Sequence, residues 1–203
     1  MEIPKRLIDC LNENKVTYEI LHHPEAVTAQ RIAQAEHVKG RHHAKVVMTK
    51  SGGQHLMMVL PADHKIDLEK VEKAIGKGVS LDKEAEFKSL FPDCAIGAMP
   101  PFGNLYGLPT YMDKDLAEQD YIVFEAGTHT DAIKMSYRDY EKIVKPKVED
   151  LGVKLQPMKG ARGYEKPRSD SDRANEGCVD KPGSLAGLRN RAGNFRSGES
   201  FAH

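Results

Sequence analysis

The sequence is short of several features that mark particular classes of protein. Its 203 residues include three cysteines, Cys10, Cys94 and Cys178, which are scattered and odd in number and so predict neither a zinc site nor a disulfide framework. The formal net charge is zero, which excludes a global attraction to nucleic acid and leaves a local basic patch for that role. No N-terminal apolar run resembles a signal peptide, and no apolar stretch is long enough to cross a membrane. We therefore expect a cytoplasmic protein with no membrane partner.

Motifs of several enzyme classes are also missing. There is no GxSxG, no Gly-rich P-loop and no GxGxxG. The histidines show no HxxxH or HxH spacing, and the adjacent His42 and His43 would face opposite sides of a strand, so we expect no metal site. Nothing near Cys94 in the sequence would lower the pKa of its thiol, which favours a buried structural role. If the chain is an enzyme, we expect water as the nucleophile and no cofactor.

The composition changes near residue 156. Residues 1–155 contain 21 Lys and Arg and 24 Asp and Glu, a net charge of −3, whereas residues 156–203 contain 9 and 6, a net charge of +3. The second segment has no apolar period and recurring Gly, Pro, Ser and Arg, so it cannot bury enough surface to offset its ordering entropy. We predict a folded domain at 1–155 and a disordered tail at 156–203. A solvated tail is favoured over one that contacts RNA backbone.

Periodicity within 1–155 predicts both helices and strands. The expected helices cover 4–14, 28–36, 67–76, 82–91 and 136–151. The expected strands cover 16–21, 44–50, 55–61, 110–113, 121–127 and 131–136, with "SGG" as a hairpin turn between the second and third. Asp67 is expected to cap its helix, Gly76 to end it, and Ser136 and Asp139 to form a capping box. Strands in the middle flanked by helices predict an α+β domain with a mixed, mainly antiparallel central sheet.

Lys45 is the first residue that could carry chemistry. It opens an apolar strand just after "GRHH". Such a lysine either extends its ammonium to the sheet edge or is held as a cation that binds a phosphate or polarises a carbonyl. His129, in the turn "GTHT", is either a ligand-facing loop residue or a plain turn histidine.

The stretch "IGAMPPFG", residues 96–103, is the second candidate, and we call it the proline–glycine loop. Gly97 lets the backbone approach a ligand closely, and Gly103 is expected to leave the turn with positive φ. Pro100 and Pro101 fix φ and stiffen the loop. The result is either a rigid backbone wall that sorts small groups by size or an ordinary turn with a proline kink.

Four segments in this order resemble one known family: "AKVVMTK", "HLMMVLPADHKIDLEKVEKAIG", "AIGAMPPFGNLYGLPTYMD" and "YIVFEAGTHTDAIKMSYRDYEKIVKP". Together they are similar to the YbaK/ProX family of aminoacyl-tRNA deacylases, which is related to the editing domain of bacterial prolyl-tRNA synthetase. The resemblance covers roughly residues 5–150. Its most specific part is Gly97-x-x-x-Pro101-Phe102-Gly103 followed by "LPTYMD", with Lys45 about fifty residues earlier.

The resemblance implies a trans-editing hydrolase for mischarged tRNA carrying a small amino acid (Ala, Ser, Thr or Cys). Water would attack the ester with help from the ribose hydroxyl of the substrate. The partner would be the tRNA acceptor end, with an aminoacyl-tRNA synthetase as a further candidate and no DNA partner. The residues it implies for catalysis are Lys45, Gly97 and Pro101. Those it implies for substrate binding are Ala98, Met99, Pro100, Phe102, Gly103, Gly127, Thr128 and His129.

Two other functions stay open on the sequence. One is a non-catalytic module that uses the same pocket to sense amino acids or to contact tRNA or a synthetase. The other is an RNA-binding adaptor that acts through the tail. Lys39, Arg41 and Lys50 are candidates for phosphate contact, with solvated surface as the alternative.

Overall fold

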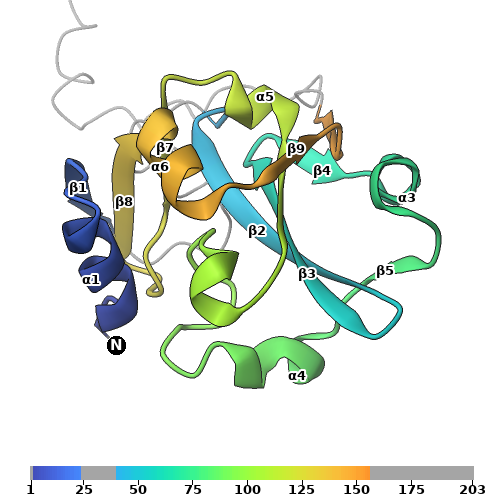
Figure 1. Cartoon of the computed structure of the whole chain (residues 1–203), viewed down its shortest axis with the longest axis horizontal. Helices are drawn as coiled ribbons and strands as arrows, with labels where there is room; N and C mark the ends of the chain where they lie inside the picture. The colour runs from blue at the N-terminus through green and yellow to red at the C-terminus, as the bar shows by residue number, and fades with distance from the viewer. Residues whose placement is uncertain (1, 24–39, 156–203) are drawn as a thin grey trace, which may run out of the picture. The chain divides into compact units, whose positions relative to one another are not determined.

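The computed structural model describes residues 2–23 and 40–155, and Figure 1 shows how their elements are arranged. The helix expected at 28–36 and the tail at 156–203 lie outside these residues. Within the described ranges, no helix is long and apolar enough to span a membrane.

Most strands form one sheet in the spatial order β1-β8-β7-β2-β3-β6-β9, with β5 paired to β2 (Figure 1). These strands are β1 (Tyr18–His22), β2 (His43–Ser51), β3 (Gln54–Pro61), β5 (Val79–Leu81), β6 (Thr110–Asp113), β7 (Tyr121–Glu125), β8 (Asp131–Ser136) and β9 (Lys147–Glu149). The β1–β8, β7–β8, β2–β3 and β2–β5 pairs are antiparallel, and the β2–β7, β3–β6 and β6–β9 pairs are parallel. Short strands β4 (His64–Ile66) and β10 (Gly152–Lys154) pair separately. The predicted α+β class with a mixed, mainly antiparallel sheet is confirmed.

Helices pack against both faces of the sheet. On β3, Met57 and Val59 face one core cluster and Met58 and Leu60 face another, as alternation along a strand requires. The first cluster takes side chains from α1 (Lys5–Glu13), α5 (Lys114–Ala117) and α6 (Tyr137–Val144), and the second takes Val71 from α3 (Leu68–Ile75). Figure 1 shows α1 at the left and α3 at the right of the view, on opposite sides of strands β2 and β3.

Several elements begin, turn or end at the residues that local sequence signals predicted. Asp67 caps α3 by accepting from the N–H groups of Glu69 and Lys70, and Gly76 ends the helix at φ 109°. Gly52 and Gly53 both have positive φ, 57° and 84°, as a two-residue hairpin turn requires. The predicted strand at 110–113 matches β6 residue for residue.

Other predicted elements were wrong in extent. The helix expected at 136–151 ends at Val144, because Lys145 adopts the left-handed conformation and Pro146 follows, and β9 then begins at Lys147. Ser136 is the N-cap of that helix, but its side chain makes no capping hydrogen bond. The helix expected at 82–91 is divided into α4 (Glu84–Phe87) and a 3₁₀ turn (Lys88–Leu90).

Candidate active site

The proline–glycine loop is joined to the loop after β7, residues 126–130, by two backbone hydrogen bonds. The N–H of Ala95 donates to the carbonyl of Gly127 at 2.8 Å, and the N–H of Gly127 donates to the carbonyl of Ala98 at 2.8 Å. Gly97 lies between these anchors at φ 90°, and Gly127 has φ 87°. A Cβ on Gly127 would lie 2.5 Å from Pro4 Cδ of α1's N-cap residue, so this junction has no room for a side chain. The two predicted substrate-binding loops are therefore one rigid unit.

The second half of the proline–glycine loop is anchored in the core. The hydroxyl of Tyr140 donates to the carbonyl of Pro101 at 2.7 Å. The Phe102 ring is fully buried and lies 5.4 Å, between centroids, from the rings of both Phe124 and Tyr140. These contacts explain the stiffness expected of the loop and assign the Phe102 side chain to its support.

Gly103 is needed for a reason that the sequence did not indicate. It does not have the expected positive φ. A Cβ there would lie 2.2 Å from the Thr110 hydroxyl oxygen and 2.7 Å from the Leu108 carbonyl. The glycine therefore permits close chain approach rather than an unusual turn.

Gly97 and His129 form the more accessible part of the joined loops. Gly97 is exposed, and a Cβ there would lie 3.6 Å from His129 Cε1. His129 Nδ1 lies 3.6 Å from a carboxylate oxygen of Glu125, whose side chain is 12% exposed. Glu125 ends β7 and was not singled out from the sequence, although a single acidic residue closing the apolar run "YIVFE" is an available signal.

The Thr128 side chain makes a hydrogen bond within the protein, to the first residue of β8. Its hydroxyl donates to Asp131 at 2.5 Å, and the other oxygen of that carboxylate lies 2.6 Å from His22 Nδ1. The Thr128 hydrogen bond, with those of His22 and Thr130, holds the pKa of Asp131 below its usual value. Asp131, which contacts both the buried Thr128 and His22, therefore links the loop after β7 to strand β1.

Cys94, just before the proline–glycine loop, is a poor nucleophile. Burial raises the pKa of its thiol to about 11, and its sulfur lies 3.2 Å from the Tyr106 hydroxyl. The expected structural role of this thiol agrees with that environment.

Lys45 lies on β2, next to β7. The parallel register pairs Ala44 with Phe124, both in the first core cluster, so Lys45 and Glu125 follow them on neighbouring strands and point to the opposite face. The Lys45 ammonium donates to the carbonyl of Ala62 at 3.4 Å and to the carbonyl of His64. Burial lowers the pKa of Lys45, and the charge of Asp63 partly opposes this shift. The lysine is thus a half-buried cation held at the turn between β3 and β4.

The structure unites some of the predicted residues and separates others. Gly97, Ala98, Gly127 and His129 come together in the joined loops. Among the described residues, the hydrogen bonds of Lys45 go to the β3–β4 turn and none to those loops. Lys50 lies at the far end of β2, where its ammonium pairs with Glu86 in a cavity of about 510 Å³. Arg41 is exposed, and Lys39 lies outside the described residues.

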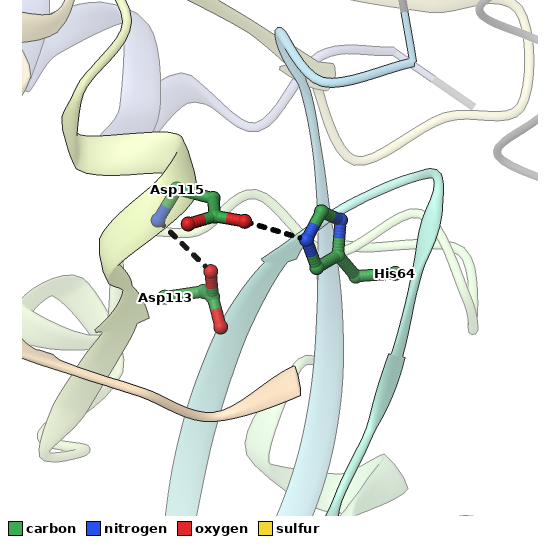
Figure 2. Close-up of side chains that lie close together, drawn as sticks. All are labelled: His64, Asp113 and Asp115. Atoms are coloured by element: carbon green, nitrogen blue, oxygen red, sulfur yellow. Dashed lines mark hydrogen bonds and ion pairs between the residues drawn. The ribbon is translucent and has the colours of Figure 1, made fainter. Parts of the chain in front are cut away.

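His64, whose carbonyl accepts from Lys45, is a buried histidine, and Figure 2 shows its ring beside Asp115 and Asp113. The two ring nitrogens of His64 lie 2.9 Å from Asp63 and 2.9 Å from Asp115. Asp113 completes the group, but its oxygens accept the N–H groups of Asp115, Leu151 and Gly152 at 2.9–3.0 Å. Each of these three side chains has a hydrogen-bond partner within the described fold, and we interpret the group as structural.

Comparisons with known proteins agree on one family. A family model described as the aminoacyl-tRNA editing domain matches residues 23–143. The multifunctional Ser/Thr-tRNA deacylase ProXp-y of Escherichia coli (strain K12) is 28% identical over 150 residues, which cover 71% of this chain and 89% of the relative. The prolyl-tRNA editing protein ProX of Acetoanaerobium sticklandii is 24% identical over 151 residues, which cover 71% and 92%. A crystal structure provisionally described as a trans-editing enzyme for prolyl-tRNA synthetase has a TM-score of 0.64 at 21% identity, over 73% of this chain and 96% of that one, which supports the fold.

Proposed function

Because the chain belongs to the aminoacyl-tRNA editing domain family, we propose that it is a trans-editing hydrolase for mischarged aminoacyl-tRNA that carries a small amino acid. The observation that carries the proposal is the family match over residues 23–143, which includes Lys45, the proline–glycine loop and His129. The two curated relatives are, by their names, a Ser/Thr-tRNA deacylase and a prolyl-tRNA editing protein.

The rigidity of the joined loops supports selection by size. The loops are held by hydrogen bonds of 2.8 Å at Ala95 and Gly127 and by the Tyr140 anchor, so they cannot easily widen for a larger side chain. In a pocket lined by these loops, one methylene of the substrate would be worth about 1–3 kcal/mol. That margin suits the distinction between Ala, Ser, Thr or Cys and larger residues, with Ser and Thr favoured by the name of one relative.

Two groups are suited to hold the substrate. The Lys45 ammonium, kept half-buried at a strand end, would bind the phosphate of the terminal nucleotide or its neighbour, which makes the tRNA acceptor end the partner. The N–H of Gly97 lies 3.1 Å from the Met99 sulfur. Thioether sulfur is a weak acceptor, so an ester oxygen can replace it at little cost and receive that hydrogen bond as negative charge develops.

Water is the nucleophile in this scheme. The raised pKa of Cys94, about 11, makes its thiolate scarce near neutral pH. The water oxygen bonds to the ester carbonyl carbon, the bond from that carbon to the ribose oxygen breaks, and the ribose oxygen takes a proton. Free amino acid and deacylated tRNA result. We propose that the neighbouring ribose hydroxyl of the substrate assists the attack of water. The His129–Glu125 pair lies next to Gly97, where the ester would bind.

The test is a deacylation panel with Ala-, Ser-, Thr-, Cys- and Pro-tRNA. We expect wild-type protein to release one or more small amino acids, and we expect Lys45→Ala to lose at least roughly 100-fold in rate while it stays folded. Lys142→Ala is the matched control, because that lysine is 75% exposed on α6 and pairs with Asp139 on the same helix. A folded, fully active Lys45→Ala protein would contradict the role of Lys45. Binding of aminoacyl-tRNA without turnover would favour a non-catalytic module.

A further inference from the structure

We propose that Asp115 and His64 are positioning residues that fix the Lys45 ammonium through the turn between β3 and β4. This proposal rests on the proposed function, because it concerns the lysine assigned to substrate binding there. The chain of contacts runs from Asp115 on helix α5 to the His64 ring, which Figure 2 shows, and from the His64 carbonyl to the Lys45 ammonium.

The first step is the hold on the ammonium. Both hydrogen-bond acceptors of Lys45 among the described residues are main-chain carbonyls, those of Ala62 and His64. A carbonyl holds an ammonium in place only if its own peptide unit is fixed. The position of Lys45 Nζ therefore depends on the rigidity of three consecutive residues, 62–64, at the turn.

The second step is the hold on that turn. The His64 side chain is 4% exposed, and its two ring nitrogens lie 2.9 Å from carboxylate oxygens of Asp63 and Asp115. Asp63 belongs to the same turn, whereas Asp115 belongs to α5, 51 residues further along the chain. The Asp115 contact thus ties the His64 ring to α5, while the backbone of the turn is also held by the Ala62 N–H on the His43 carbonyl and the Leu155 N–H on the Asp63 carbonyl, both at 2.8 Å.

The third step is the anchorage of α5 itself. Asp113 accepts the N–H of Asp115 at 3.0 Å through one oxygen and the N–H groups of Leu151 and Gly152 through the other. Gly152 begins β10, which pairs with β4 and so returns to His64. The Asp113 hub is 1% exposed and stays intact if the Asp115 side chain is removed. We call the Asp115–His64 contact the brace. Truncating Asp115 therefore removes the brace and leaves the hydrogen bonds of Asp113 in place.

Asp115→Ala is the decisive variant, because that side chain is 45% exposed and its loss leaves no buried cavity. Displacing a binding group by a fraction of an ångström is costly to catalysis, so we expect kcat/KM for deacylation to fall roughly tenfold. Asp115→Asn keeps an oxygen acceptor for His64 and should stay within about threefold of wild type. Glu118→Ala is the matched control, since it removes an exposed carboxylate at the end of the same helix, and it should stay within about twofold.

The ¹³Cε signal of Lys45, in protein labelled with ¹³C-lysine and assigned with Lys45→Arg, reports the position of the ammonium without relying on activity. We expect this signal to move in Asp115→Ala and to stay in place in Glu118→Ala. An unmoved signal in Asp115→Ala would overturn the proposal, as would a moved signal with deacylation unchanged from an active wild type. If wild type deacylates nothing, the proposed function fails instead, and a moved signal would still support the brace.

Discussion

Asp131 connects the loop after β7 to strand β1, and its ionisation should be visible in the stability of the fold. The Thr128 hydroxyl, His22 and the Thr130 hydroxyl all contact this carboxylate and hold its pKa below the usual value. A lowered folded pKa contributes stability that is present above the unfolded pKa, about 3.9, and is lost as the pH falls through the folded pKa.

Asp131→Asn should therefore destabilise the protein by about 1 kcal/mol near pH 6, measured by urea unfolding, and by less at pH 2.5. Asp9→Asn is the control, because Asp9 is exposed on α1. If the difference in the free energy of unfolding between wild type and Asp131→Asn is equal at both pH values, this origin of the pKa shift is ruled out.

The role of a single residue could be predicted where it depends on the neighbouring sequence, and could not where it depends on residues distant in the chain. The glycines of the proline–glycine loop were recognisable from residue type, but Gly103 needs its hydrogen because of Thr110 and Leu108, not because of its φ. The Asp115–His64 contact joins residues 51 positions apart and leaves no trace in local pattern. Residue type thus indicates that a position is special, whereas the reason comes from its neighbours in space.

At the scale of elements, prediction succeeded where a signal was local. The Asp67 cap, the Gly52–Gly53 turn and the apolar run of β7 can each be recognised within a few residues. It failed where the chain departs from its own periodicity. The apolar period of α6 continues past residue 144 in the sequence and so predicted a longer helix. In the structure, the left-handed conformation of Lys145 ends the helix, and residues 147–149 pair with β6. Strands of three residues, such as β4 and β10, are too short to show a period.

Helix α6 and the proline–glycine loop are joined by one buried hydrogen bond, which gives a prediction about two elements. Tyr140→Phe removes the hydroxyl that donates to the Pro101 carbonyl at 2.7 Å and leaves that buried carbonyl without this donor. We expect the free energy of unfolding to fall by about 1–3 kcal/mol in urea denaturation. We also expect slower deacylation, because the loop loses an anchor.

Tyr137→Phe is the matched control for this change. Tyr137 lies one turn earlier on α6, and its hydroxyl donates to Glu141 of the same helix at 3.4 Å. It should cost well under 1 kcal/mol and leave the rate unchanged. Equal losses in the two variants would show that the Pro101 anchor contributes nothing specific.

At the scale of the whole molecule, the family resemblance expected from the sequence is confirmed by the match over residues 23–143. The arrangement of the candidate site was harder to predict from the sequence. Lys45, residues 96–103 and residues 126–130 were each recognisable, but their relation depends on the parallel β2–β7 pairing, which brings strands about eighty residues apart into one sheet. Lys45 lies on β2 and its ammonium is held by the β3–β4 turn, whereas the joined loops include the loop after β7, so the proposed substrate would have to contact both.

The tail supplies the last prediction, and it concerns the balance of charge over the chain. Residues 156–203 carry a net charge of +3 against −3 for residues 1–155, and the first compact unit of the chain ends at Pro157. We expect a protein cut after Pro157 to unfold within about 0.5 kcal/mol of the full chain and to deacylate at an unchanged rate in 150 mM salt. Removing cations that do contact RNA would instead weaken tRNA binding and flatten its dependence on salt. Binding titrations of both proteins at 50 and 200 mM salt separate these cases: parallel salt slopes support a solvated tail, and a shallower slope for the shortened protein would make the tail part of the tRNA interface.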